Sequence, residues 1–158
     1  MKYKLLPIFL TLLTAQLFAQ DKNLNKQKSN QILFGPSLGY QYQGENFIKL
    51  SAFSLMGVND DQYLKVNLGA NFTRINKKTA AIPELGISYY LSENVITPYT
   101  KLELTTQTIT PTAGISYFTF VDVGVGYGVN FGNADRFKTI KGFTLAVGIN
   151  VPLNFNVY

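Results

Sequence analysis

The chain of 158 residues contains no cysteine and no histidine. Without cysteine it can form no disulfide, and it cannot be a lipoprotein that is cut and acylated at a cysteine. Without histidine, a Ser–His or Cys–His catalytic pair cannot exist, and metal sites built from histidine and cysteine are excluded as well. We therefore expect a protein that is not an enzyme and that has no metal site and no cofactor.

Long apolar runs are also missing after the first nineteen residues. Within those residues, two lysines precede an apolar stretch at residues 5–13, and Ala19 is a small residue suited to a cleavage site. The stretch is shorter than the roughly 20 apolar residues that a membrane-spanning helix needs. We expect residues 1–19 to be a cleaved signal peptide that exports the chain, and residues 20–31, which hold four charges, to be a flexible periplasmic tail.

Charge is scarce in this chain. Charged residues make up 15% of it, and the formal net charge of +5 falls to +3 once the two lysines of the signal peptide are removed. This excess is too small to indicate nucleic-acid binding, so we expect no nucleic-acid partner. Because only helices and closed barrels satisfy the backbone inside lipid, a membrane span in this chain would have to be built from strands.

What the sequence does contain is a strict two-residue alternation, which is clearest in its last predicted strand. The odd positions of that strand are all apolar: Phe143, Leu145, Val147, Ile149, Val151, Leu153 and Phe155. The even positions between them are small or polar. Because successive side chains on a strand point to opposite faces, this strand has one apolar face and one small or polar face.

The same alternation recurs along most of the chain and divides it into eight segments joined by short turns. The predicted strands cover residues 32–43, 47–57, 62–73, 80–91, 95–105, 109–118, 121–131 and 142–155. The least distinct turn is Thr119-Phe120, because the apolar phase continues from Ile115 to Val129 and one long strand is an alternative there. We prefer eight strands. This predicts an all-β domain over residues 32–158, an eight-stranded antiparallel up-and-down transmembrane β-barrel.

Two types of barrel fit alternating strands, and the placement of charge separates them. A soluble ligand-carrying barrel turns its polar face to water, where a folded protein normally carries many charges. The predicted polar face carries only six, three positive and three negative: Lys49, Lys65, Glu84, Lys101, Glu103 and Asp122. Its other positions are rich in Gly, Ser, Thr and Asn, which suit the narrow interior of an eight-stranded barrel. We therefore predict that the polar face lines the lumen and the apolar face meets lipid, with Phe53 and Leu55 as the weakest fit.

Aromatic residues gather near the predicted strand ends, as they do at the two interfaces of a membrane. If both termini are periplasmic, one group lies near the outer interface: Tyr40, Tyr42, Phe72, Phe131 and Phe143. A second group lies near the inner interface: Phe34, Tyr89, Tyr117 and Phe155.

Two groups of charged residues are candidates for a functional role. The six lumen charges, together with Tyr63, Tyr90 and Tyr99, form either a bonded plug or a narrow polar path. We favour the plug, because an unpaired buried charge costs several kcal/mol. The second group is a set of basic residues at the outer rim: Arg74, Lys77, Lys78, Arg136, Lys138 and Lys141. These side chains are suited to lipopolysaccharide phosphates, with ordinary charged loops as the alternative interpretation.

These features resemble the small eight-stranded outer-membrane barrels of the OmpA/OmpX type, often called porin-like. The resemblance covers the signal, the eight strand segments and the aromatic final residue, Tyr158. It implies a place in the outer membrane of a Gram-negative envelope, contact with outer-membrane lipid, and assembly by the barrel-assembly machinery, which reads a terminal aromatic residue.

The leading functional hypothesis is a non-enzymatic integral outer-membrane β-barrel with a structural or interaction role and a plugged polar lumen. A narrow porin for small solutes is the first alternative. A soluble periplasmic barrel that binds an apolar ligand is the second.

Overall fold

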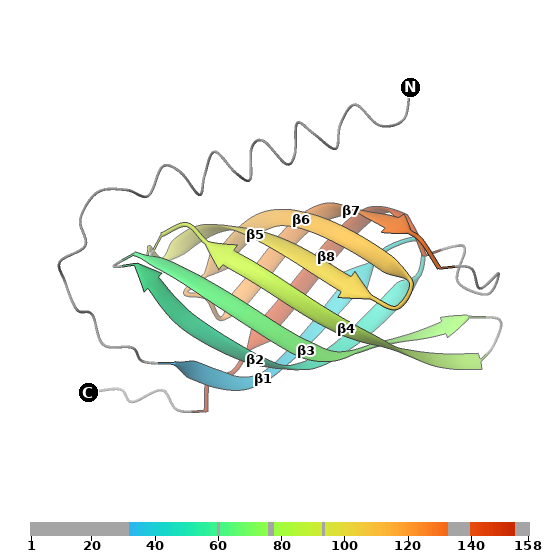
Figure 1. The fold of residues 1–158 in the computed structure, drawn as a ribbon, viewed down its shortest axis with the longest axis horizontal. Helices are drawn as coiled ribbons and strands as arrows, with labels where there is room; N and C mark the ends of the chain where they lie inside the picture. Colours follow the sequence, from blue (N-terminus) through green and yellow to red (C-terminus); the bar gives the residue numbers. More distant parts are fainter. Residues whose placement is uncertain (1–31, 60, 76–77, 93, 133–139, 154–158) are drawn as a thin grey trace, which may run out of the picture.

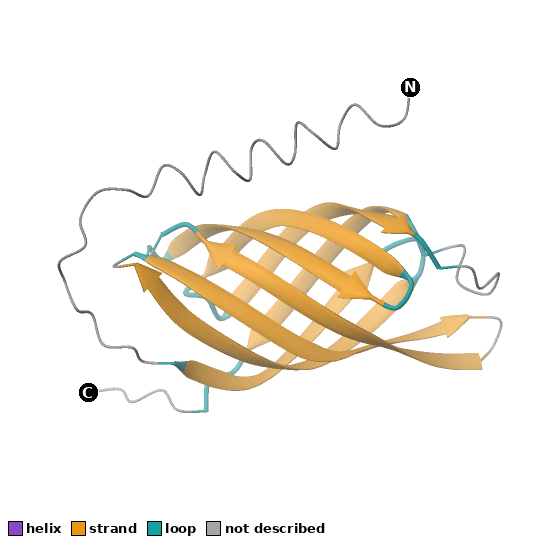
Figure 2. Ribbon diagram, viewed as in Figure 1, coloured by secondary structure: helices purple, strands orange, loops and turns teal. Residues whose placement is uncertain are grey.

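The computed structural model describes residues 32–59, 61–75, 78–92, 94–132 and 140–153. Over these ranges the chain forms β1 (Leu33–Tyr42), β2 (Asn46–Asn59), β3 (Gln62–Ile75), β4 (Lys78–Tyr90), β5 (Ile96–Thr105), β6 (Thr108–Tyr117), β7 (Val121–Asn130) and β8 (Gly142–Asn150). Each strand pairs antiparallel with the next, and β8 pairs with β1, so the sheet closes into an up-and-down barrel (Figures 1 and 2). The predicted eight-stranded antiparallel barrel is confirmed.

The predicted signal peptide at residues 1–19, the predicted tail at residues 20–31 and the terminal Tyr158 lie outside these ranges. In the part that the structure describes, no helix combines the length and the apolar character needed to cross a membrane.

The strand bounds agree with the predicted ones to within a few residues, except in β8. This strand ends at Asn150, whereas the alternation predicted a strand that continues to Phe155. Pro36 of β1 accounts for the difference, because it lies opposite Val151 and, as a proline, has no N–H to return the bond that it accepts from Val151. The chain still follows β1 a little further, since the backbone N–H groups of Val151 and Leu153 donate to carbonyl groups of β1 at 3.0 and 2.9 Å.

The turn between β6 and β7, which was the least distinct in the sequence, is present. Phe118 and Thr119 have φ angles of 51° and 59°, and the N–H of Phe120 donates to the carbonyl of Tyr117 at 3.0 Å. Two consecutive residues with positive φ are the mark of the tight hairpin turn that matches the twist of its strands. The apolar phase continues through this turn, so periodicity alone could not mark it.

The barrel has two different ends. At the terminal end, β1 begins and β8 stops, as Figure 1 shows. At the hairpin end, residues 73–75 of β3 and residues 78–83 of β4 extend beyond the neighbouring strands, because the β2–β3 ladder reaches Phe72 and the β4–β5 ladder begins at Glu84. The β3–β4 hairpin therefore overhangs the rim.

The outward face of the barrel is apolar and exposed. On β7, the side chains of Val123, Val125, Tyr127 and Val129 are between 40% and 61% exposed. On β8, the residues predicted for the apolar face are outward as well, from Phe143 to Leu153. The alternate positions, which face the lumen, are small or polar and mostly buried. The chain thus turns its apolar side chains outward and its polar ones inward.

β2 shows why Phe53 and Leu55 were the weakest fit to the predicted phase. Phe53 and Leu55 point into the barrel and are each 5% exposed, on the same strand face as Lys49. The outward face of this strand is provided by Ile48 and Leu50, which are 61% and 54% exposed. The two residues were out of phase because the lumen is not polar along its whole length.

Candidate functional site: the charged lumen

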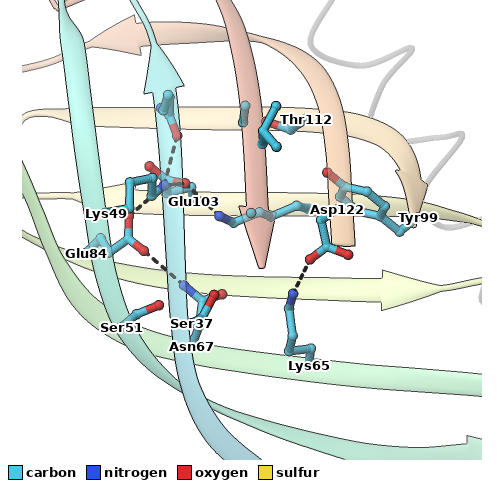
Figure 3. Close-up of a pocket in the computed structure, with 16 residues that line it drawn as sticks. Ser37, Lys49, Ser51, Lys65, Asn67, Glu84, Tyr99, Glu103, Thr112 and Asp122 are labelled. Atoms are coloured by element: carbon cyan, nitrogen blue, oxygen red, sulfur yellow. Dashed lines mark hydrogen bonds and ion pairs between the residues drawn. The ribbon is translucent and has the colours of Figure 1, made fainter. Parts of the chain in front are cut away.

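All six charges predicted for the lumen converge on one cavity in the middle of the barrel (Figure 3). They come from β2, β3, β4, β5 and β7: Lys49, Lys65, Glu84, Lys101, Glu103 and Asp122. The cavity measures about 50 Å³, and small residues of β1 and β8, among them Gly39, Ala146 and Gly148, line its other side. A space of this size has room for a few water molecules.

The first group of charges is centred on Lys49. Its ammonium group lies 2.7 Å from Oε2 of Glu84, also pairs with Glu103, and donates to Oε1 of Gln41 at 2.8 Å. Lys101 approaches the same oxygen of Glu103 at 2.8 Å, so this carboxylate serves two lysines. Every one of these charges has an opposite charge beside it, so the two positive and two negative charges balance within the group.

The second group is centred on Asp122. Its carboxylate pairs with the ammonium group of Lys65 at 2.5 Å and accepts hydrogen bonds from the hydroxyl groups of Ser116 at 2.6 Å and Tyr90 at 3.0 Å. The amide of Asn150 donates to it at 3.0 Å. Lys65 is less well supplied, since beyond Asp122 it donates to Oδ1 of Asn150 at 3.3 Å and lies 5.3 Å from the centre of the Tyr90 ring.

A cluster of apolar side chains lies on each side of these charges. Toward the terminal end, Phe53, Leu55, Tyr90 and Tyr99 form one cluster, against which Leu33 and Tyr63 pack. Toward the hairpin end, the second cluster contains Phe47, Ile75, Ile82 and Ile140. The charged layer thus lies between two apolar clusters, and polar side chains such as Gln43 and Thr108 line the space beside the cluster at the hairpin end. The three tyrosines expected among the lumen charges lie in or against the terminal cluster, and Tyr90 also binds Asp122.

The basic residues expected at the outer rim are described in part. Arg74 and Lys78 are exposed on the overhanging hairpin, and Lys141 is exposed just before β8. Lys77, Arg136 and Lys138 lie outside the described residues. Arg74 lies two residues after the outward-facing Phe72, and Lys141 lies two residues before the outward-facing Phe143. Each basic residue is thus on the same side of its strand as the aromatic residue.

Sequence reasoning did not identify the polar residues that connect the charges across the barrel. Asn150 accepts a hydrogen bond from Ser37 at 2.9 Å and donates both to Asp122 and to the carbonyl of Thr119. Gln43 accepts a bond from Gln41 at 2.7 Å. Strand parity gives the inward orientation of Asn150 and Gln41, but a contact between residues 113 positions apart, such as Ser37 and Asn150, leaves no local signal.

No family model and no curated protein matches this chain. A solved structure from work described as "De novo design of transmembrane beta-barrels" is similar over 80% of this chain and 100% of that chain, with a TM-score of 0.38 and 16% identity. So distant a likeness adds nothing to what the strand pairing shows. The comparisons do not assign the chain to the OmpA/OmpX type. The strand pairing shows an eight-stranded antiparallel β-barrel.

Proposed function

We propose that this protein is an integral β-barrel of the outer membrane, with a structural or interaction role and no catalytic activity of its own. The observation that carries the proposal is the inversion of the usual arrangement, with apolar side chains outside and paired charges inside. In water, so large a continuous apolar surface would promote aggregation. In a bilayer it is the stable arrangement, because lipid contacts the outer face and the closed ladder satisfies the backbone.

The dimensions of the apolar surface support the same proposal. On β1 the outward apolar positions run from Phe34 to Tyr42, and on β8 and its extension they run from Phe143 to Leu153. A tilted transmembrane strand needs about 9–11 residues. Both stretches have this length.

Exposed aromatic residues also lie at two levels, as at the interfaces of a bilayer. The group toward the hairpin end is 39–60% exposed: Tyr40, Tyr42, Phe72, Phe131 and Phe143. Toward the terminal end, Phe34 and Tyr117 are 51% and 54% exposed and Tyr89 is partly exposed, while Phe155 lies outside the described residues.

The two alternatives find less support. A soluble carrier of an apolar ligand needs an apolar cavity, whereas the central cavity here is lined by all six lumen charges. A porin needs a continuous polar path, whereas an apolar cluster lies on each side of the charged layer. We therefore propose that the lumen is a plug, not a pore.

Lipid is the partner that this proposal implies. With the hairpin end directed outward, Arg74 and Lys141 would stand just beyond the outer aromatic level, where phosphate groups of lipopolysaccharide lie. Assembly by the barrel-assembly machinery, implied by the resemblance to small outer-membrane barrels, belongs to the same proposal.

Membrane fractionation combined with gel electrophoresis tests the proposal. We expect the chain to stay in the outer-membrane fraction after carbonate and urea washes. We also expect unboiled and boiled samples to migrate differently in detergent, because a closed barrel resists unfolding until it is heated. Release by the washes together with identical migration would rule out the membrane barrel.

A further inference from the structure

The turn between β6 and β7 is built unlike a turn that faces water. Phe118 is 50% exposed at its tip, and its ring packs edge-on against Tyr117 with the ring centres 4.8 Å apart. Phe118 and Thr119 hold positive φ angles that normally select glycine or asparagine. A bulky aromatic side chain at such a position is unfavourable for the backbone conformation, so Phe118 occupies the turn at a local cost in free energy.

The neighbouring turn continues the same apolar surface. Val95 and Ile96, at the start of β5, are 47% and 58% exposed. The N–H of Phe118 donates to the carbonyl of Val95 at 2.9 Å, and Ile96 pairs with Tyr117 across the β5–β6 ladder. We call Val95, Ile96, Tyr117 and Phe118 the turn patch. It joins the outward apolar face directly, because Tyr117 pairs with Val121 of β7.

The carbonyl groups of this turn are all bonded within the protein. The carbonyl of Tyr117 accepts from the N–H of Phe120 at 3.0 Å, and that of Phe118 accepts from the hydroxyl of Thr119 at 2.6 Å. Asn150 supplies the other two bonds, from its side-chain amide to Thr119 at 2.9 Å and from its backbone N–H to Phe120 at 2.7 Å. Satisfied carbonyl groups are what a turn needs where water is scarce.

The turn on the other side of the barrel has a more polar tip. Between β2 and β3 the exposed residues Asn59 and Asp61 are polar or charged, and the preceding Val58 is an exposed apolar side chain. In the strand order of the closed sheet, β2 and β3 lie across the barrel from β6 and β7. At the terminal end, the tip of the β6–β7 turn is therefore apolar, whereas the tip of the β2–β3 turn is mainly polar.

We propose that the turn patch inserts into the boundary between headgroups and acyl chains of the leaflet at the terminal end. The barrel then sits deeper at the β6–β7 turn than at the β2–β3 turn. This inference rests on the proposed membrane location and adds the depth and the tilt of the barrel. Its partner is the lipid interface itself, with which the patch is continuous through the outward face of β7.

Because the chain contains no tryptophan, single tryptophans report on depth without background. We would refold Phe118→Trp, Asn59→Trp and Val125→Trp in phosphatidylcholine vesicles that contain brominated lipids, after checking folding by heat-dependent gel migration. Phe118→Trp should show blue-shifted emission and several-fold stronger quenching than Asn59→Trp. Val125→Trp, in the middle of the outward face, should be quenched most strongly by bromines deep in the bilayer. Should Phe118→Trp fail to fold, Val95→Trp makes the same measurement.

The outcomes separate this inference from the proposed function. If Val125→Trp is quenched while Phe118→Trp and Val95→Trp resemble Asn59→Trp, the turn patch lies in water and the inference is wrong, although the membrane barrel survives. If Val125→Trp is not quenched either, the membrane location itself is wrong.

Discussion

The ion pair of Lys65 and Asp122 offers the sharpest test of how the lumen holds the barrel together. Lys65 is 5% exposed, and its ammonium group has two acceptors, Asp122 at 2.5 Å and Asn150 at 3.3 Å. Asp122→Asn removes the negative charge while keeping the size of the side chain. The amide group replaces one acceptor oxygen with a donor, so in either orientation of the side chain one of the donors around Asp122 loses its acceptor.

The two halves of this pair should not be equivalent. Removing one partner of a buried ion pair costs about 3–5 kcal/mol, because the other charge remains buried without compensation. We expect Asp122→Asn to lose this amount, since Lys65 then has only neutral acceptors, such as Oδ1 of Asn150. Lys65→Met should cost less, about 1–3 kcal/mol, because Asp122 keeps three donors, from Ser116, Tyr90 and Asn150. The double variant should lose less than the sum, with a coupling of about 2 kcal/mol.

Urea unfolding of the protein refolded in phospholipid vesicles measures these differences. The folded fraction is read from the migration of unboiled samples, and the four proteins of the cycle are compared under the same lipid and pH. Equal losses for the two single variants would contradict the asymmetry of donors around Asp122. Strict additivity in the double variant would show that the two charges do not interact in the membrane.

Three further predictions test the outward face, the packing of the wall and the plug. Val125→Arg should destabilise the assembled barrel by about 2–4 kcal/mol, whereas Val125→Leu should change it by no more than about 0.5 kcal/mol; equal urea midpoints would mean that this face does not meet lipid. Gly69→Ala should cost about 1–3 kcal/mol in the same assay, because its Cβ would lie 2.2 Å from the carbonyl oxygen of Leu50, while Gly148→Ala, with 3.9 Å to its nearest neighbour, should be tolerated. In planar bilayers the unmodified protein should pass little or no steady current. The Glu84→Ala variant, which removes a partner of Lys49, should show more frequent channel openings. Large stable current steps from the unmodified protein would refute the plug.

The orientation of side chains was predictable because it is a local property. The alternation at Phe143–Phe155 gave the outward face of β8, and the same rule put all six lumen charges on the inner face. The strand number followed from the same pattern together with turn residues. What the pattern could not give was the end of β8, where the opposite residue Pro36 has no N–H to continue the ladder, and the turn at Phe118, where Phe118 and Thr119 adopt a backbone conformation that usually belongs to glycine or asparagine.

By itself, then, the sequence determined eight strands and which side of each faces inward, because both follow from geometry repeated every two residues. Only the tertiary structure decided which charges meet. Lys49 pairs with Glu103, 54 positions away, and Lys65 pairs with Asp122, 57 positions away. Partners across a closed barrel are set by the stagger between strands, which accumulates around the whole sheet and is encoded at no single position. The same stagger brings Phe53 of β2 and Tyr90 of β4 into one apolar cluster, so that a lumen predicted from the sequence to be polar also contains packed apolar side chains.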